Sequence, residues 1–307
     1  MQINLAVQLG MGFTVLIVGL KVLKDSLYQS VNDKLELILN LLTGNLFIGV
    51  VTGIVITMII QSSSATIALV IALLNAGILS FRQGRYIVIG ANIGTTVTVQ
   101  IFSWPLEGYV HLLLAVGLGL YLICYFLERN WLKYIAQGLV GFGILFFGLR
   151  LLEGLIRSEQ AVFFLHLVNK AAYNPLIGIL AGGIITAIIQ SSSALTGVVV
   201  ALAKEEAITL SAALAVALGS NIGTCITAFI ASVGTKPVAK KLAYFHLFFN
   251  LVGGVIIFIF LRPFGQLVSL SADVLAKQVA NAHTIFNIFT GCLFILLEKN
   301  KSRNLGS

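Results

Sequence analysis

Charged residues are scarce in this sequence: Asp, Glu, Lys and Arg make up 10% of its 307 residues, whereas 58% are hydrophobic. Soluble domains carry about 25% charged residues, so this composition excludes an ordinary soluble globular protein. Apolar runs close to the ~20 residues that cross a bilayer as a helix recur along the chain. They cover residues 5–20, 87–102, 110–127, 134–149, 242–261 and 285–297. The sequence therefore predicts an all-α polytopic membrane protein.

Cysteines are also few. Cys124, Cys225 and Cys292 lie in apolar segments, without the spacing of a disulfide framework or a metal site, so we expect no transition-metal site. The formal net charge is +8. Its Lys and Arg residues fall in short stretches between apolar runs, as the positive-inside bias requires. We therefore expect this basic chain to have a lipid bilayer as its partner, and no nucleic acid.

Two polar motifs each occur twice. The sequence Gln-Ser-Ser-Ser-Ala at residues 61–65 returns at residues 190–194. Gly-Ala-Asn-Ile-Gly-Thr at residues 90–95 returns as Gly-Ser-Asn-Ile-Gly-Thr at residues 219–224. Each second motif lies 129 residues after the first, so no residue is inserted or lost between them. A constant spacing of this kind indicates two copies of one structural unit.

The repeat predicts a single transmembrane domain that covers residues 1–307. Copy 1 is expected at about residues 1–128 and copy 2 at about residues 130–262, followed by a final crossing at about residues 281–297. We expect each copy to contain a re-entrant helical hairpin, formed by its Ser-rich segment, and a broken helix.

The charge bias flips between the copies. Arg82 and Arg85 follow the first Ser-rich segment, whereas Glu205 and Glu206 follow the second. Because basic residues mark the cytoplasmic side, this predicts inverted topology. Three crossings in each copy and the final one give about seven full crossings plus two hairpins. The N-terminus is then external and the C-terminus cytoplasmic.

Three further assignments follow from charge and hydropathy. Lys21, Lys24 and Lys34, with Arg82 and Arg85, put the ends of the first Ser-rich segment on the cytoplasmic side. Residues 31–42 mix charges with leucines and are expected to form an amphipathic helix at the membrane surface. Residues 162–172 are its expected counterpart in copy 2.

The serines of the two hairpins are the candidate anion ligands. Each triplet has an apolar stretch on both sides that is too short to cross a bilayer comfortably alone. A break at the triplet would place its serines at the N-terminus of a half-helix, where free N–H groups and the helix dipole attract an anion. Serines that only cap or join helices are the alternative. The residues are Ser62, Ser63, Ser64, Ser191, Ser192 and Ser193.

Neutral oxygen ligands near the motifs are the candidate Na⁺ ligands. Asn and Thr oxygens, with Gln carbonyls and freed backbone carbonyls, suit a small hard cation; helix packing by Gly and Thr is the alternative. The candidates are Gln61, Asn92, Thr95, Gln190, Asn221 and Thr224. The hairpins and the broken helices contain no charged residue at these motifs. This disfavours a buried Arg clamp or a carboxylate proton relay, and a bound cation would offset the charge of the anion.

Two histidines have an Asn four residues on, and therefore on the same helix face. They are His246 with Asn250, and His283 with Asn287. Both could line the pathway or titrate near neutral pH. Interhelical hydrogen bonds are the more common use of such residues in membranes.

The paired Gln-Ser-Ser-Ser motifs, the Gly-x-Asn-Ile-Gly-Thr segments and the terminal Ala-His-x-x-x-Asn pattern at residues 282–287 resemble the type II sodium-dependent phosphate cotransporter family. The resemblance is to its short bacterial form without a C-terminal regulatory domain. It implies Na⁺-coupled transport of inorganic phosphate by alternating access in the bacterial cytoplasmic membrane. It also implies phosphate at the six serines and Na⁺ around the Gln, Asn and Thr residues named above. No cofactor other than Na⁺ is expected, and the oligomeric state is left open.

Other functions remain to be weighed against this expectation. A phosphate exporter or a carrier of another oxyanion would keep the same fold, and a passive anion channel would need a continuous pore. An intramembrane serine hydrolase is disfavoured because the sequence has no Gly-x-Ser-x-Gly elbow and no acid or base beside the serines. The chain is therefore expected not to be an enzyme. Cys225 stands where the first copy has a threonine, which puts a ligand role there in doubt.

Overall fold

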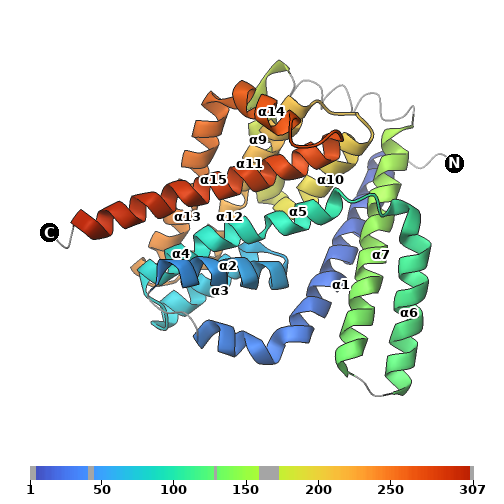
Figure 1. Cartoon of the computed structure of the whole chain (residues 1–307), viewed down its shortest axis with the longest axis horizontal. Helices are drawn as coiled ribbons and strands as arrows, with labels where there is room; N and C mark the ends of the chain where they lie inside the picture. The colour runs from blue at the N-terminus through green and yellow to red at the C-terminus, as the bar shows by residue number, and fades with distance from the viewer. Residues whose placement is uncertain (1–4, 41–44, 128–129, 159–172, 305–307) are drawn as a thin grey trace.

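The computed structural model describes residues 5–40, 45–127, 130–158 and 173–304, and these ranges contain α-helices, one 3-10 turn and no strand (Figure 1). The predicted all-α class is confirmed. The helices of copy 1 are α1 (Leu5–Asn40), α2 (Leu46–Ile60), α3 (Ser63–Ala76), α4 (Phe81–Gly94), α5 (Thr96–Phe102) and α6 (Val110–Phe126), with η1 (Glu107–Tyr109) before α6. Those that follow are α7 (Asn130–Ile156), α9 (Pro175–Ile189), α10 (Ser192–Lys204), α11 (Leu210–Gly223), α12 (Cys225–Ser232), α13 (Pro237–Ile259), α14 (Leu261–Ser269) and α15 (Leu275–Asn304).

Six helical segments of the described residues are long and apolar enough to cross a membrane. They lie on α1, η1 with α6, α7, α11 with α12, α13 and α15. The polytopic expectation is thereby confirmed. The seventh expected crossing falls on α4 and α5, which divide at Thr95. Four shorter apolar helices, α2, α3, α9 and α10, are the halves of the two Ser-rich segments. Their re-entry from one side of the membrane stays a prediction.

The two copies pack their own helices in the same way. A Cβ atom on Gly53 of α2 would lie 2.2 Å from the carbonyl oxygen of Ile87 on α4. At the equivalent position of copy 2, a Cβ on Gly182 would lie 2.2 Å from the carbonyl oxygen of Val216. Only glycine allows two backbones to approach so closely, as is common for helix pairs in membranes. The same spacing in sequence has produced the same helix pair twice.

Helices α1 and α7 occupy equivalent places in the two copies, and they contact each other reciprocally. Gly19 of α1 lies against the backbone of Leu145 on α7, and Gly148 of α7 lies against the backbone of Leu16 on α1. Gly148 and Leu145 lie 129 residues after Gly19 and Leu16, so each contact is the equivalent of the other in the repeat. As the residue number rises on α1 it falls on α7, so these two helices are antiparallel. The orientation of the copies relative to a membrane stays a prediction.

Two surface assignments need comment. The amphipathic helix expected at residues 31–42 is helical up to Asn40, where it forms the last part of α1. Its position at the membrane surface stays a prediction. Figure 1 shows the last part of this blue helix bending away from its first part. Its expected counterpart, residues 162–172, lies outside the described residues.

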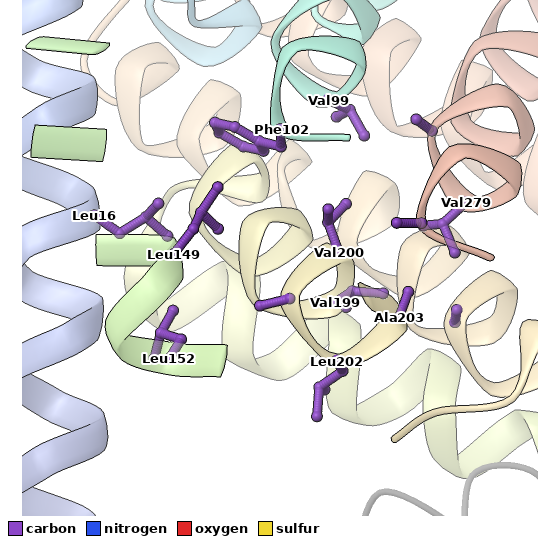
Figure 2. Close-up of a cluster of buried hydrophobic side chains, with 14 of the residues drawn as sticks. Leu16, Val99, Phe102, Leu149, Leu152, Val199, Val200, Leu202, Ala203 and Val279 are labelled. Atoms are coloured by element: carbon purple, nitrogen blue, oxygen red, sulfur yellow. The ribbon is translucent and has the colours of Figure 1, made fainter. Parts of the chain in front are cut away.

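A buried apolar cluster joins the copies beside the second hairpin (Figure 2). Val200 of α10 lies among side chains from four helices that belong to other parts of the chain. These neighbours are Leu16 on α1, Val99 and Phe102 on α5, Leu149 on α7 and Val279 on α15. Because lipid is as apolar as these side chains, a close fit and not exclusion from water holds this contact together in a membrane.

Candidate functional site

Both Ser-rich segments break at the glutamine that precedes the serines. Gln61 has φ 52° and Gln190 has φ 58°, which is the left-handed region. The backbone N–H of each glutamine donates to the carbonyl oxygen of the threonine four residues earlier, Thr57 or Thr186, over 2.7 Å. A non-glycine residue in this conformation is uncommon, and tertiary packing must hold it there. The helix–break–helix arrangement expected for each Ser-rich segment is therefore present at the level of the backbone.

The first serine of each triplet caps the following half-helix. The Oγ of Ser62 accepts a hydrogen bond from the N–H of Ala65, and the Oγ of Ser191 accepts one from Ala194, both over 3.2 Å. The capping role weighed in the sequence is thus real for these two serines. It leaves each hydroxyl hydrogen free to donate elsewhere. The N–H groups at the first two positions of α3 and α10 have no acceptor within their own helices.

Both hairpin tips open into one cavity of about 350 Å³. The cavity brings together all six candidate serines and both glutamines of the motifs. Its lining is Ile17, Leu20, Lys21, Lys24, Asp25, Gln61, Ser62, Ser63, Ser64, Gln190, Ser191, Ser192 and Ser193. The positive ends of two half-helices, α3 and α10, therefore meet at the same space. Hydroxyls, free N–H groups and two helix dipoles form a cradle with the chemistry of an anion site.

Three charged residues of α1 line the same cavity, and the sequence analysis missed them there. It used Lys21 and Lys24 to assign the cytoplasmic side and considered only neutral donors at the hairpins. Helix α1 runs on past both lysines and carries Lys21, Lys24 and Asp25 alongside the serines. Their spacing of three and four residues puts them on one helix face. This spacing was the signal that could have revealed them.

The candidate cation ligands are only partly brought together. Gln61 and Gln190 line the cavity, whereas the Asn and Thr candidates are buried in the two broken helices. In copy 1, the Oε1 atom of buried Gln61 accepts a hydrogen bond from the Oγ1 of Thr98 over 2.7 Å. Thr98 lies on α5, one turn after the helix break at Thr95. Asn92 donates through Nδ2 to the carbonyl oxygen of Val88 over 2.9 Å. The contact between Gln61 and Thr98 ties the first hairpin to its own broken helix.

Copy 2 uses the same residue types differently. Gln190 is exposed, and its side chain has no hydrogen-bond partner within the described part of the chain. The Oγ1 of Thr224 donates to the carbonyl oxygen of Ser220 over 2.9 Å. Asn221 Oδ1 lies 3.1 Å from Nε2 of His283 on α15. Among the described residues, the Gln190 side chain therefore makes no contact like that of Gln61 with Thr98. The second hairpin is joined to its broken helix one turn earlier, where the Oγ1 of Thr186 donates to the Oγ of Ser220 over 2.9 Å, and Asn221 also joins that helix to α15.

The histidine expectation is confirmed for one residue and wrong for the other. His283 makes the interhelical contact with Asn221. His246 is fully buried, but neither of its ring nitrogens has a hydrogen-bond partner among the described residues. Asn250, four residues on, donates from Nδ2 to the Sγ of Cys225 over 3.5 Å. Cys225, in the place of the first copy's threonine, thus takes part in helix packing.

Ion pairs lie where α7 and α10 end, and the pair of Lys204 with Glu107 joins the two copies. Lys204, the last residue of α10, contacts the carboxylate of Glu107 and donates to the carbonyl oxygen of Trp104 over 3.1 Å. Arg157, which follows α7, donates from Nη2 to Oε1 of Glu205 over 2.8 Å. The lysine and Glu107 are mostly covered by protein, whereas 72% of the Arg157 side chain is exposed.

An all-α, multi-pass chain with two repeated units and a polar cavity at two hairpin tips has the architecture of a membrane transporter. The chain belongs to the Na⁺/Pi-cotransporter family, whose sequence model matches residues 15–154 and 159–272. This confirms the family resemblance found in the motifs.

Three relatives illustrate the match. YqeW of Bacillus subtilis is 35% identical over 294 residues, which cover 93% of each chain. YjbB of Escherichia coli, a protein named for inorganic phosphate export, is 27% identical over 251 residues that cover 80% of this chain and 44% of its own length. Human sodium-dependent phosphate transport protein 2B is 37% identical over 83 residues, 25% of this chain and 12% of its own. No solved structure matches.

Proposed function

We propose that this protein is a secondary active transporter that carries inorganic phosphate across a bacterial cytoplasmic membrane together with Na⁺. The observation that supports this most directly is the single cavity that both Ser-rich tips share. Family membership supports the substrate and the coupling ion. Phosphate would lie between Ser62, Ser63 and Ser64 of one copy and Ser191, Ser192 and Ser193 of the other.

The neutral oxygens beside the tips would hold Na⁺. Helices α2 and α9 end at the cavity with their negative ends, at Gln61 and Gln190. Gln61 with Thr98, and the threonine at each break, Thr95 and Thr224, would supply oxygens of the kind that Na⁺ prefers. A dianion and a cation at neighbouring sites strengthen the binding of each other, and this strengthening is reciprocal. Coupled transport is the result that such reciprocity favours.

Alternating access is supported by the difference between the two sides of the cavity. Lys21, Lys24 and Asp25, on the predicted cytoplasmic side, line the cavity. On the predicted external side, the apolar cluster of Figure 2 and the contact of Lys204 with Glu107 join the copies. This arrangement would suit a state open to the cytoplasm. To open outward, the protein would have to separate α10 from α5 and break the contact at Lys204.

Export is the second candidate, because one relative is named for phosphate export. The same site can carry phosphate in either direction, since the gradients decide the net flux. Efflux of labelled phosphate from loaded proteoliposomes, with Na⁺ inside or outside, distinguishes the two directions.

The decisive experiment is uptake of labelled phosphate into proteoliposomes, with an inward Na⁺ gradient compared with a matched K⁺ gradient. We expect accumulation only with Na⁺, and a loss of at least 100-fold in the Ser62→Ala/Ser191→Ala double variant. Ser269→Ala, at an exposed serine of α14, is the matched control and should keep full uptake. Phosphate uptake that is equal in both gradients would contradict the coupling to Na⁺. A double variant as active as the control would contradict the assignment of the site.

A further inference from the structure

The charged residues of α1 are the part of the cavity that the family motifs do not explain. Lys21, Lys24 and Asp25 share one helix face and line the cavity with the serines. We propose that the two lysines neutralise the bound anion and that Asp25 selects an oxyanion that carries a proton, so that the cavity accepts phosphate and arsenate and rejects sulfate. This inference rests on the proposed function and names the specificity of its site.

The two lysines supply positive charge that the serine hydroxyls and the backbone N–H groups lack. Neutral donors alone leave the desolvation of a doubly charged anion costly. Among the described residues, neither lysine has an ion pair within 4.0 Å. Both are therefore available to the anion. A flexible ammonium group binds phosphate as a point charge and does not need the fixed geometry of an arginine fork.

Asp25 is the group that can tell phosphate from sulfate. Serine hydroxyls donate or accept, and the free N–H groups and the lysines only donate, so none of them detects a proton on the anion. An ionised carboxylate only accepts. Near neutral pH inorganic phosphate carries at least one proton, which it can donate to Asp25, whereas sulfate carries none and would face the carboxylate with a bare oxygen. A site built around such a hydrogen bond strongly rejects the analogue that lacks it.

The remaining acceptors do not replace Asp25. The Oε1 atom of Gln61 already accepts from Thr98. Gln190 can turn its amide and present either a donor or an acceptor. Asp25 makes no ion pair with Lys21 or Lys24 within 4.0 Å, in the part of the chain that the structure describes. It is thus the one carboxylate among the residues that line the cavity.

The test is competition in the proteoliposome assay at one pH near neutrality. Labelled phosphate is the substrate, and unlabelled arsenate or sulfate is added in excess. In the unchanged protein arsenate should inhibit uptake and sulfate should not. In Asp25→Asn, whose amide can donate to sulfate, sulfate should inhibit at a concentration at least 10-fold lower than before. Asp25→Glu should still reject sulfate.

The Lys21→Met/Lys24→Met double variant should raise the KM for phosphate at least 10-fold while uptake stays dependent on Na⁺.

Asp273→Asn and Lys240→Met are the matched controls, at exposed positions outside the cavity, and should behave like the unchanged protein. If Asp25→Asn transports phosphate and still rejects sulfate, the inference is overturned although the proposed function stands. If Asp25→Asn is inactive, thermal shifts of the purified variants with phosphate or sulfate decide. A shift by sulfate in Asp25→Asn but not in Asp25→Glu supports the role of Asp25, and any other pattern overturns it. Failure of the unchanged protein to take up phosphate would instead contradict the proposed function.

Discussion

The two Ser-rich hairpins have nearly the same motif and the same backbone break, but different surroundings. In copy 1, Gln61 is buried and bound by Thr98 of its own broken helix. In copy 2, Gln190 is exposed and lines the shared cavity. The local sequence sets the break, and the packing around it decides whether the tip is held. The two glutamines therefore differ in their surroundings although the motifs around them are nearly the same.

The far ends of the hairpins show the same contrast. In copy 1, Asn75 at the end of α3 accepts a hydrogen bond through Oδ1 from the backbone N–H of Lys236, over 2.9 Å. At the equivalent positions of copy 2, Lys204 pairs with Glu107. Each hairpin is thus attached to the other copy at the same place, but by a neutral contact in one case and by charges in the other. We infer that the charged attachment is the one that responds to ions and salt.

The largest effect is expected from the close helix pairs in which the two copies are alike. A Cβ on Gly90 would lie 2.0 Å from the carbonyl oxygen of Val50, and a Cβ on Gly219 would lie 1.9 Å from that of Ile179. Gly90→Ala and Gly219→Ala should each force two helices apart and cost about 3 kcal/mol or more of stability. Thermal unfolding in detergent and the yield of monodisperse protein measure the loss.

The control for these variants is Gly119→Ala on α6, where nothing lies within 4 Å of the added methyl group. It should be neutral or stabilise by about 0.5–1 kcal/mol, because alanine favours a helix more than glycine does. If Gly90→Ala lowers the unfolding temperature and Gly219→Ala does not, the two helix pairs are not equivalent. The comparison between the two copies would then be wrong.

A smaller effect should separate the two glutamines. Gln61→Ala leaves the hydroxyl of buried Thr98 without its acceptor, which should cost about 1–3 kcal/mol of stability. Gln190→Ala removes an exposed side chain and should leave the unfolding temperature unchanged, while it lowers Na⁺-dependent uptake. Thermal unfolding and Na⁺-dependent uptake are measured on the same preparations. Equal losses of stability in both variants would show that the second tip is as firmly held as the first.

The sequence predicts the symmetric features of the molecule better than the asymmetric ones. The motifs and their constant spacing led to both helix breaks and to a shared position for all six serines. The different states of Gln61 and Gln190 could not be predicted, because the same short sequence surrounds both and only tertiary packing separates them. Lys21, Lys24 and Asp25 were not expected in the cavity, because α1 continues past them and the apolar run that predicted the crossing ends before them. His246 shows the same limit, since its helix face was predicted and its lack of a partner was not.

The smallest effect is expected at the charged attachment of the second hairpin. Lys204 and Glu107 are largely covered by protein, so a double-mutant cycle with Lys204→Met and Glu107→Gln should give a coupling free energy of about 1 kcal/mol. Arg157→Ala is the control, because a pair with a highly exposed partner contributes little, and it should leave the unfolding temperature unchanged.

If the contact of Lys204 with Glu107 closes the external side, Lys204→Met should also make the cavity reachable from outside. A cysteine placed at Ser191 would then react faster with an impermeant thiol reagent added to the outside of vesicles of known orientation, and an unchanged rate would remove Lys204 from the closure.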